Sequence, residues 1–235
     1  MLPVVILAGG LATRMKPMTE KIPKAMLDID GRPFIYHQLN LLKKKGINRV
    51  ILCVGFLGEM IESYVGDGTK FQLDVKYSYD GEKLLGTGGA IKKALEYLDD
   101  AFFVLYGDSY LDVDYGKIEA TFLRAPRKGL MTVFKNEGKW DTSNVIFRNN
   151  EILVYSKKKT EEMNCIDYGL GILSKAVFND FENETAFDLA FLYERLAEEK
   201  QLMGYEVFER FYEIGSKEGL KDLQQKIYEQ GSFFR

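Results

Sequence analysis

Short apolar runs alternate with amphipathic patterns over the first half of the chain. The runs Val4–Leu7, Val50–Val54 and Phe102–Tyr106 are rich in β-branched and aromatic residues, and turn residues follow them. Such runs predict buried strands of a parallel sheet. Leu73–Tyr79 alternates apolar and polar residues, which predicts one further strand.

Helical patterns fill the intervals between these strands. In Pro33–Lys45 the proline suits a first turn, apolar residues recur on one face, and Gly46 ends the pattern. Leu57–Val65 and Ala90–Leu98 are the other two predicted helices. Strands that alternate with helices of this length form right-handed βαβ units. We therefore expect an α/β, Rossmann-like fold with a mostly parallel sheet flanked by helices.

The second half has a less regular pattern. Four strand candidates follow with few helices between them: Leu130–Lys135, Val145–Phe147, Ile152–Tyr155 and Tyr168–Leu173. A final amphipathic helix is predicted over Ser216–Gln230, with Ser216 as its N-cap. We expect a small mixed extension of the sheet within a single domain over residues 1–235. No hexapeptide repeat is visible, so no β-helix domain is expected.

Composition excludes several classes of protein. The 235 residues carry 32 basic and 35 acidic side chains, a net charge of −3, which argues against a general nucleic-acid binder. No apolar run approaches the ~20 residues that span a bilayer, and the N-terminus does not resemble a signal peptide. Cys53, Cys165 and one histidine do not make a usual zinc site. Unpaired cysteines favour a cytoplasmic location.

A polar loop after the first predicted strand contains the most informative residues. Gly9 and Gly10 let the backbone approach a ligand, and Arg14 and Lys24 add positive charge nearby. Backbone donors together with an arginine and a lysine favour a polyphosphate site. The glycines alone are equally typical of a tight turn, and the loop matches neither G-x-G-x-x-G nor a Walker A motif.

The segment Leu7–Arg14, followed by Lys24 in Pro-Lys-Ala-Met, resembles the signature of the sugar-1-phosphate nucleotidylyltransferases. These enzymes make an NDP-sugar and pyrophosphate from an NTP and a sugar 1-phosphate. The resemblance implies that Arg14 grips the leaving pyrophosphate and that Lys24 stabilises the α-phosphate. The family usually has glycine where this chain has Ala12, so that position must avoid a conformation open to glycine only. Residues implied to contact the nucleotide here are Leu7, Ala8, Gly9, Gly10 and Thr13.

Two acidic residues are candidates for a magnesium site. Asp108 directly follows a predicted strand, at the sheet edge where parallel sheets bind ligands. A carboxylate there suits Mg²⁺ bound to phosphate oxygens, although turn capping is equally expected from the residue alone. The resemblance makes Asp108 the metal-binding and catalytic aspartate of the family's Gly-Asp motif. Glu213 stands where the family commonly has a second aspartate ligand, and its side chain is one methylene longer.

Three glycines within Leu85–Ala90 open a predicted helix. They predict a bare helix N-terminus with exposed N–H groups, or alternatively a flexible loop. The resemblance implies that Gly86 and Thr87 lie against the nucleobase and ribose. The form Leu-Gly-Thr-Gly-Gly-Ala resembles the heptose and mannose 1-phosphate guanylyltransferase branch. The segments Gly66–Gly68 and Gly81-Glu82 are shared with a branch that makes UDP-N-acetylmuramate.

Residues of the second half match the part of the family signature that binds the sugar phosphate. Lys157 occupies the place of the family's phosphate-gripping lysine, although a run of lysines is equally typical of a solvated turn. Ser156 replaces a glutamate that often contacts sugar hydroxyls. Asp167 and Gly169 match an Asn-x-Gly segment that lines the sugar, with Asp in place of Asn, and Asn144 stands at the same end.

The resemblance implies a Mg²⁺-dependent nucleotidyl transfer. Residues 1–125 would form the nucleotide-binding half, and residues 126–235 the sugar-phosphate-binding half with the closing helix. GTP with a manno-configured heptose or mannose 1-phosphate is the favoured substrate pair. UTP or dTTP with another sugar 1-phosphate, such as N-acetylmuramate or glucose 1-phosphate, is the alternative, as is a non-catalytic nucleotide-sugar-binding subunit. We expect no nucleic-acid or membrane partner, and a homo-oligomer is possible.

Overall fold

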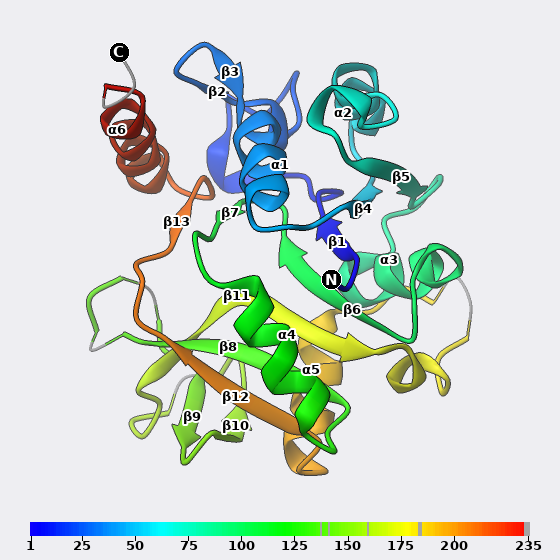
Figure 1. Cartoon of the computed structure of the whole chain (residues 1–235), viewed down its shortest axis with the longest axis vertical. Helices are drawn as coiled ribbons and strands as arrows, with labels where there is room; N and C mark the ends of the chain where they lie inside the picture. The colour runs from blue at the N-terminus through cyan, green and yellow to red at the C-terminus, as the bar shows by residue number, and fades with distance from the viewer. Residues whose placement is uncertain (137, 141, 159, 183–184, 233–235) are drawn as a thin grey trace.

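The computed structural model describes residues 1–136, 138–140, 142–158, 160–182 and 185–232, with the backbone alone at 230–232. A nine-stranded sheet crosses the molecule in the order β5-β4-β1-β6-β11-β8-β12-β10-β9 (Figure 1). Its first four strands are mutually parallel. Their bounds are β5 Asp74–Tyr79, β4 Arg49–Val54, β1 Val4–Leu7 and β6 Ala101–Tyr106.

The remaining five strands form a mixed extension. β11 is antiparallel to β6 and β8, β12 is parallel to β8, and β10 is antiparallel to β12 and β9. Their bounds are β8 Gly129–Lys135, β9 Val145–Arg148, β10 Glu151–Tyr155, β11 Cys165–Ser174 and β12 Leu202–Val207. This arrangement, with helices on both faces, confirms the predicted α/β fold with a mixed extension.

Alternation along the strands explains the two layers of helices. In β1, Val4 and Ile6 enter one core cluster and Val5 enters the other. The first cluster lies under α1 (Phe34–Lys44), α2 (Gly58–Val65) and α4 (Tyr115–Arg124). The second lies under α3 (Gly86–Ala94) and α5 (Leu189–Glu198). Figure 1 shows α4 in front of the sheet and α5 behind it.

A third, smaller core joins the two ends of the chain. Leu220 and Leu223 of α6 (Lys217–Ser232) pack against Met15 and Leu27 from the loop after β1. Short antiparallel pairs complete this region: β2 (Asp28–Ile29) with β3 (Arg32–Pro33), and β7 (Ser109–Tyr110) with β13 (Tyr212–Glu213). Single 3₁₀ turns lie at Thr13–Met15, Lys24–Met26, Thr69–Phe71, Leu95–Tyr97 and Lys175–Phe178. The β7–β13 pair is important because it brings Asp108 and Glu213 to the same place.

The structure corrects the sequence-based elements in a few places. The third helix begins at Gly86, not Ala90, and its last turn is a 3₁₀ helix. The helices α4 and α5 and the strand β12 were not predicted. The N-cap at Ser216 is confirmed, because its Oγ accepts the backbone N–H of Gly219 at 2.9 Å. Among the described helices, none has the length and apolarity that crossing a bilayer requires.

Candidate active site

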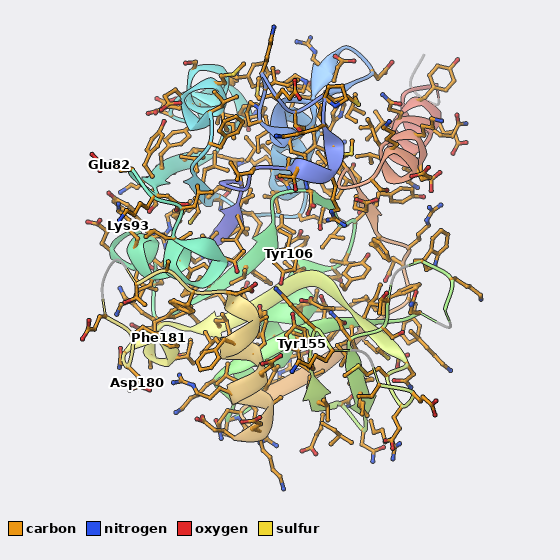
Figure 2. All side chains as sticks on the ribbon, turned by 180° about the vertical axis from the view of Figure 1, so that it is seen from behind. Glu82, Lys93, Tyr106, Tyr155, Asp180 and Phe181 are labelled. Atoms are coloured by element: carbon orange, nitrogen blue, oxygen red, sulfur yellow. The ribbon has the colours of Figure 1, made fainter. Side chains whose placement is uncertain are left out.

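Two cavities meet at the carboxyl ends of the parallel strands. The first, about 250 Å³, lies over β1, β4, β5 and β6, and the second, about 820 Å³, lies over the mixed half of the sheet. Thr87, Tyr106 and Asp108 line both cavities. Figure 2 shows Tyr106 near the centre of the molecule, with Tyr155 of the second cavity below it. Asp108 therefore stands at a junction that two ligands could share.

The first cavity gathers most of the predicted nucleotide-binding residues. The predicted residues that line it are Leu7, Ala8, Gly9, Gly10, Lys24, Gly86, Thr87 and Asp108. We call it the nucleotide cavity. Thr13 is not part of this lining; it is exposed and begins a 3₁₀ turn. Ala12 does line the cavity and has φ 49° and ψ 40°. This left-handed region is open to alanine at a cost of about 1–2 kcal/mol.

The second cavity gathers most of the predicted sugar-end residues. Asn144, Lys157, Asp167 and Gly169 line it, together with Arg14 and Glu213. We call it the sugar cavity. Ser156 is not part of this lining, and its Oγ instead accepts the backbone N–H of Lys158 at 3.1 Å.

Lys24 and Asp108 form an ion pair at the junction. Lys24 Nζ lies 2.9 Å from Asp108 Oδ2, and the two side chains are 20% and 26% exposed. Lys24 follows Pro23 in a 3₁₀ turn, and Asp108 follows β6. The loop after β1 thus delivers a cation to the carboxylate at the end of a neighbouring strand.

Arg14 and Glu213 converge on the same carboxylate. A Cβ built on Gly215 would lie 2.8 Å from Glu213 Oε2 and 3.0 Å from Asp108 Oδ2. The same point is 3.3 Å from Arg14 Nη2. Gly215 therefore leaves open a small volume that two carboxylates and a guanidinium border. A larger residue at this position would fill it.

Glu213 also holds the turn that leads into the final helix. Its carboxylate accepts the backbone N–H groups of Gly215 and Ser216 and the hydroxyl of Ser216. A Cβ at Gly219 would lie 1.8 Å from Glu213 Oε1, so only glycine fits there. The carboxylate thus lies beside the N-terminus of α6, where the helix dipole favours negative charge.

The glycines that open α3 do not leave its N-terminus bare. The carbonyl oxygen of Phe187 accepts the N–H groups of Gly88 at 2.9 Å and Gly89 at 3.3 Å. A Cβ at Gly88 would overlap the Phe187 ring, 2.1 Å from Cε2. The prediction of exposed N–H groups at these two residues is therefore wrong. All three glycines, Gly86 included, leave room for a strap from the second half, residues 185–188, to pack against the start of α3.

That strap links the two cavities through Asp188. Asp188 caps α5, accepts the hydroxyl of Thr87 at 3.2 Å, and forms an ion pair with Lys157. Burial acts to raise the pKa of Asp188, but the Lys157 ammonium and the backbone N–H of Ala190 hold it below the usual value. The predicted phosphate-gripping lysine thus lines the sugar cavity and is linked through Asp188 to Thr87, which lines both cavities.

Asp167 occupies a bulge in β11. Its Oδ1 accepts the N–H of Gly169 at 3.0 Å, and its Oδ2 accepts the hydroxyl of Tyr106 at 3.2 Å. Its own backbone N–H donates to Asn144 Oδ1 at 2.9 Å. Burial raises the pKa of Asp167 to about 6. The structure therefore connects three predicted sugar-end residues and adds Tyr106.

Sequence reasoning missed several lining residues. Asp80 directly follows β5, as Asp108 follows β6, so the same signal could have found it. Asp188 precedes a helical pattern as an N-cap, which was also visible. Trp140 and Arg210 line the sugar cavity, with the Arg210 guanidinium 4.1 Å from the indole centroid. The sequence did not indicate a site role for these two residues, because they come together only in the folded chain.

Comparison with known proteins identifies this arrangement. The family model described as "Nucleotidyl transferase" matches residues 3–227. The chain belongs to the nucleotidyl transferase family. Members of this family that resemble the chain transfer nucleotidyl groups to sugar 1-phosphates. The chain is accordingly an enzyme of this class, and the resemblance found in its motifs is confirmed.

Relatives within the nucleotidyl transferase family cover nearly all of the chain. A D-glycero-alpha-D-manno-heptose 1-phosphate guanylyltransferase from Aneurinibacillus thermoaerophilus is 30% identical over 95% of this chain and 97% of its own. One from Campylobacter jejuni is 35% identical over 78% of this chain and 80% of its own. Among solved structures, HddC from Yersinia pseudotuberculosis complexed with GMP-PN has a TM-score of 0.81 and 29% identity, covering 97% of this chain and 100% of that one.

The junction fits the divalent metal on which this family generally depends. Asp108 and Glu213 supply carboxylate oxygens, which hard divalent cations prefer. No group of three or more His, Cys, Asp or Glu side chains suited to a metal occurs in the described part of the chain. A donor set of one or two carboxylates, completed by phosphate oxygens and water, is the usual arrangement for Mg²⁺.

Proposed function

We infer that the chain transfers a guanylyl group from GTP to a manno-configured sugar 1-phosphate, heptose or mannose, with Mg²⁺. The observation that carries this proposal is the placement of Lys24 and Asp108 at the junction of two cavities. Relatives named as heptose 1-phosphate guanylyltransferases, which match 78% and 95% of the chain, support the choice of substrates.

The proposed reaction forms one P–O bond and breaks another. A phosphate oxygen of the sugar 1-phosphate attacks the α-phosphorus of GTP in line, and pyrophosphate leaves. No covalent enzyme intermediate is needed, so the protein positions the substrates and neutralises charge. Mg²⁺ held by Asp108, with Glu213 as the second carboxylate, would neutralise charge on the phosphate oxygens.

The other roles follow from where the cations lie. Lys24 Nζ, at the junction, is placed to stabilise charge that develops on the α-phosphate. Arg14, which borders the same volume from the loop after β1, is assigned to the leaving pyrophosphate. Lys157, which lines the sugar cavity, is assigned to the incoming phosphate. We place the reaction in the cytoplasm, since Cys53 and Cys165 are free and buried.

A pyrophosphate-release screen tests the proposal. ATP, CTP, GTP, UTP and dTTP would each be paired with mannose, heptose, glucose and N-acetylmuramate 1-phosphates, with Mg²⁺ and with EDTA. We expect the highest turnover with GTP and a manno-configured sugar, and background rates in EDTA. The highest turnover with UTP or dTTP would overturn the substrate pair. No turnover with any pair would favour a non-catalytic nucleotide-sugar-binding subunit.

A further inference from the structure

Asp80 places a buried carboxylate in the nucleotide cavity, far from the ion pair at the junction. The residue follows the edge strand β5, is 9% exposed, and lines the cavity. Two strands, β4 and β1, separate β5 from β6, after which Asp108 stands. At ~4.8 Å between neighbouring strands, the backbone of Asp80 lies about 14 Å along the sheet edge from that of Asp108. The carboxylate reaches back over β4, so that its Oδ2 lies 3.5 Å from a Cβ built on Gly9. A nucleotide with its phosphates at Lys24 and Asp108 would therefore direct its base toward Asp80.

The carboxylate retains acceptor capacity that the protein does not use. Its Oδ2 accepts the backbone N–H of Leu85 at 3.2 Å, which is the one hydrogen bond to this carboxylate among the described residues. Lys93 donates to the backbone carbonyl of Asp80, not to its carboxylate. Burial raises the pKa of Asp80, against the opposing effects of the Leu85 N–H and the Lys93 charge. A ligand with N–H donors would add partners to a carboxylate that is largely removed from water.

The cavity around this carboxylate suits a planar ring. Leu84, Cys53 and Ala90 supply apolar surface to its lining. A Cβ built on Gly55 would lie 2.9 Å from Leu84 Cδ2 and 3.3 Å from Asp80 Oδ2, so these two side chains sit together over Gly55. A base could thus contact apolar side chains with its faces and present its polar edge to Asp80.

The pattern of donors on the bases decides which one fits a carboxylate. Guanine presents N1–H and the 2-amino group side by side. Uracil and thymine present one N–H between two carbonyl oxygens, and adenine and cytosine place a ring acceptor next to their amino group. A desolvated carboxylate attracts the first pattern and repels the carbonyl oxygens and ring acceptors of the others. We propose that Asp80 selects guanine by accepting hydrogen bonds from N1–H and the 2-amino group.

This inference rests on the proposed binding of an NTP in the nucleotide cavity. The alternative is that Asp80 has a structural role only. Asp80 also closes the loop between β5 and α3 through Leu85 N–H. Asparagine keeps an oxygen for that bond, so Asp80→Asn preserves a purely structural role. It changes base recognition, however, because the amide donates where guanine also donates. Xanthine, with a carbonyl in place of the 2-amino group, becomes the better match.

Binding measurements separate the two roles without requiring turnover. Isothermal titration calorimetry with Mg²⁺ would compare GTP, ITP, XTP and UTP on the wild-type protein and on Asp80→Asn. ITP lacks the 2-amino donor, so we expect wild-type protein to bind it about 10-fold more weakly than GTP. In Asp80→Asn, affinity for GTP should fall about 10–100-fold, and the ratio of XTP to GTP affinity should rise by at least as much.

Glu82→Gln is the matched control, since it removes one negative charge two residues away. Glu82 is exposed, lies outside the lining of the cavity, and appears at the edge of the molecule beside Lys93 (Figure 2). Its preferences should equal those of the wild type, and thermal melts would confirm that both variants fold. Equal GTP and ITP affinity in the wild type, or unchanged ratios in Asp80→Asn, would overturn the inference. Guanine selectivity without pyrophosphate release would contradict the proposed reaction but not the role of Asp80.

Discussion

The two cavities that meet at Asp108 are built from different parts of the chain. The nucleotide cavity is lined mainly by backbone and small side chains at the ends of four parallel strands. The sugar cavity takes its walls from charged and aromatic side chains of loops, β11, β13 and α6. Strand ends and glycines offer donors that suit any phosphate chain, whereas side-chain walls differ with each substitution. The first cavity is therefore suited to a phosphate chain in general, whereas the walls of the second depend more on individual side chains.

The largest expected effect is a loss of kcat on replacing Lys24, on the nucleotide side of the junction. Lys24→Ala removes a cation aimed at charge that develops in the transition state. We expect kcat to fall about 10²–10³-fold, by analogy with the loss of an oxyanion donor. Pyrophosphate release under saturating substrates measures this effect. Lys21→Ala, which removes an exposed lysine from the same loop, is the control. Wild-type kcat in Lys24→Ala would refute the assigned role.

Replacing Lys157 should instead affect the KM for the sugar 1-phosphate. Lys157→Ala removes an exposed cation that is assigned to the bound phosphate of the sugar. We expect KM for the sugar 1-phosphate to rise about 10-fold, with little change in KM for the NTP. Steady-state kinetics with each substrate varied in turn measure both constants. Lys158→Ala serves as the neighbouring control, and an equal rise in that variant would point to general surface charge instead.

On the sugar side, the titration of Asp167 should make the free energy of unfolding depend on pH. Its pKa of about 6 exceeds the value near 4 of an unfolded chain, so the native state binds the extra proton between about pH 4 and 6. Stability contributed by this residue is therefore lost as pH rises through that window. Asp167→Asn should match the wild type near pH 4 and exceed it by about 1–3 kcal/mol at pH 8.

Urea unfolding of both proteins from pH 4 to pH 8 measures that difference. Asp74→Asn, which changes an exposed carboxylate on β5, provides the baseline. A difference that stays constant over the whole pH range would contradict the assigned titration.

The smallest expected effect lies in the loop after β1. Ala12 adopts a left-handed conformation with φ 49°, which glycine occupies without strain. Ala12→Gly should raise the free energy of unfolding by about 0.5–1 kcal/mol, and Tm by about 2 °C. Ala125→Gly, at φ −97°, should instead destabilise the protein. Calorimetric melts of the two variants decide the point, and lower stability in Ala12→Gly would contradict it.

The sequence predicted the features that are local in the chain and missed contacts between residues that are far apart in it. The apolar runs of β1, β4 and β6 located the parallel half, and Gly9, Lys24 and Asp108 located the junction, because these features are local in the chain. The helix α5 was also detectable from local features but was not predicted, since Asp188 offers an N-cap and Leu189, Leu192 and Leu196 recur on one face. The strap contact of Phe187 with Gly88 was beyond reach, since it joins residues far apart in sequence.

The shared position of Asp108 has a consequence for the end of the catalytic cycle. In the proposed reaction, the nucleotide-sugar is one molecule that would occupy both cavities at once, with its diphosphate at the junction. Its two halves bind without a second loss of translational freedom, so it should bind more tightly than either substrate alone. We therefore expect accumulated nucleotide-sugar to compete with GTP and with the sugar 1-phosphate alike.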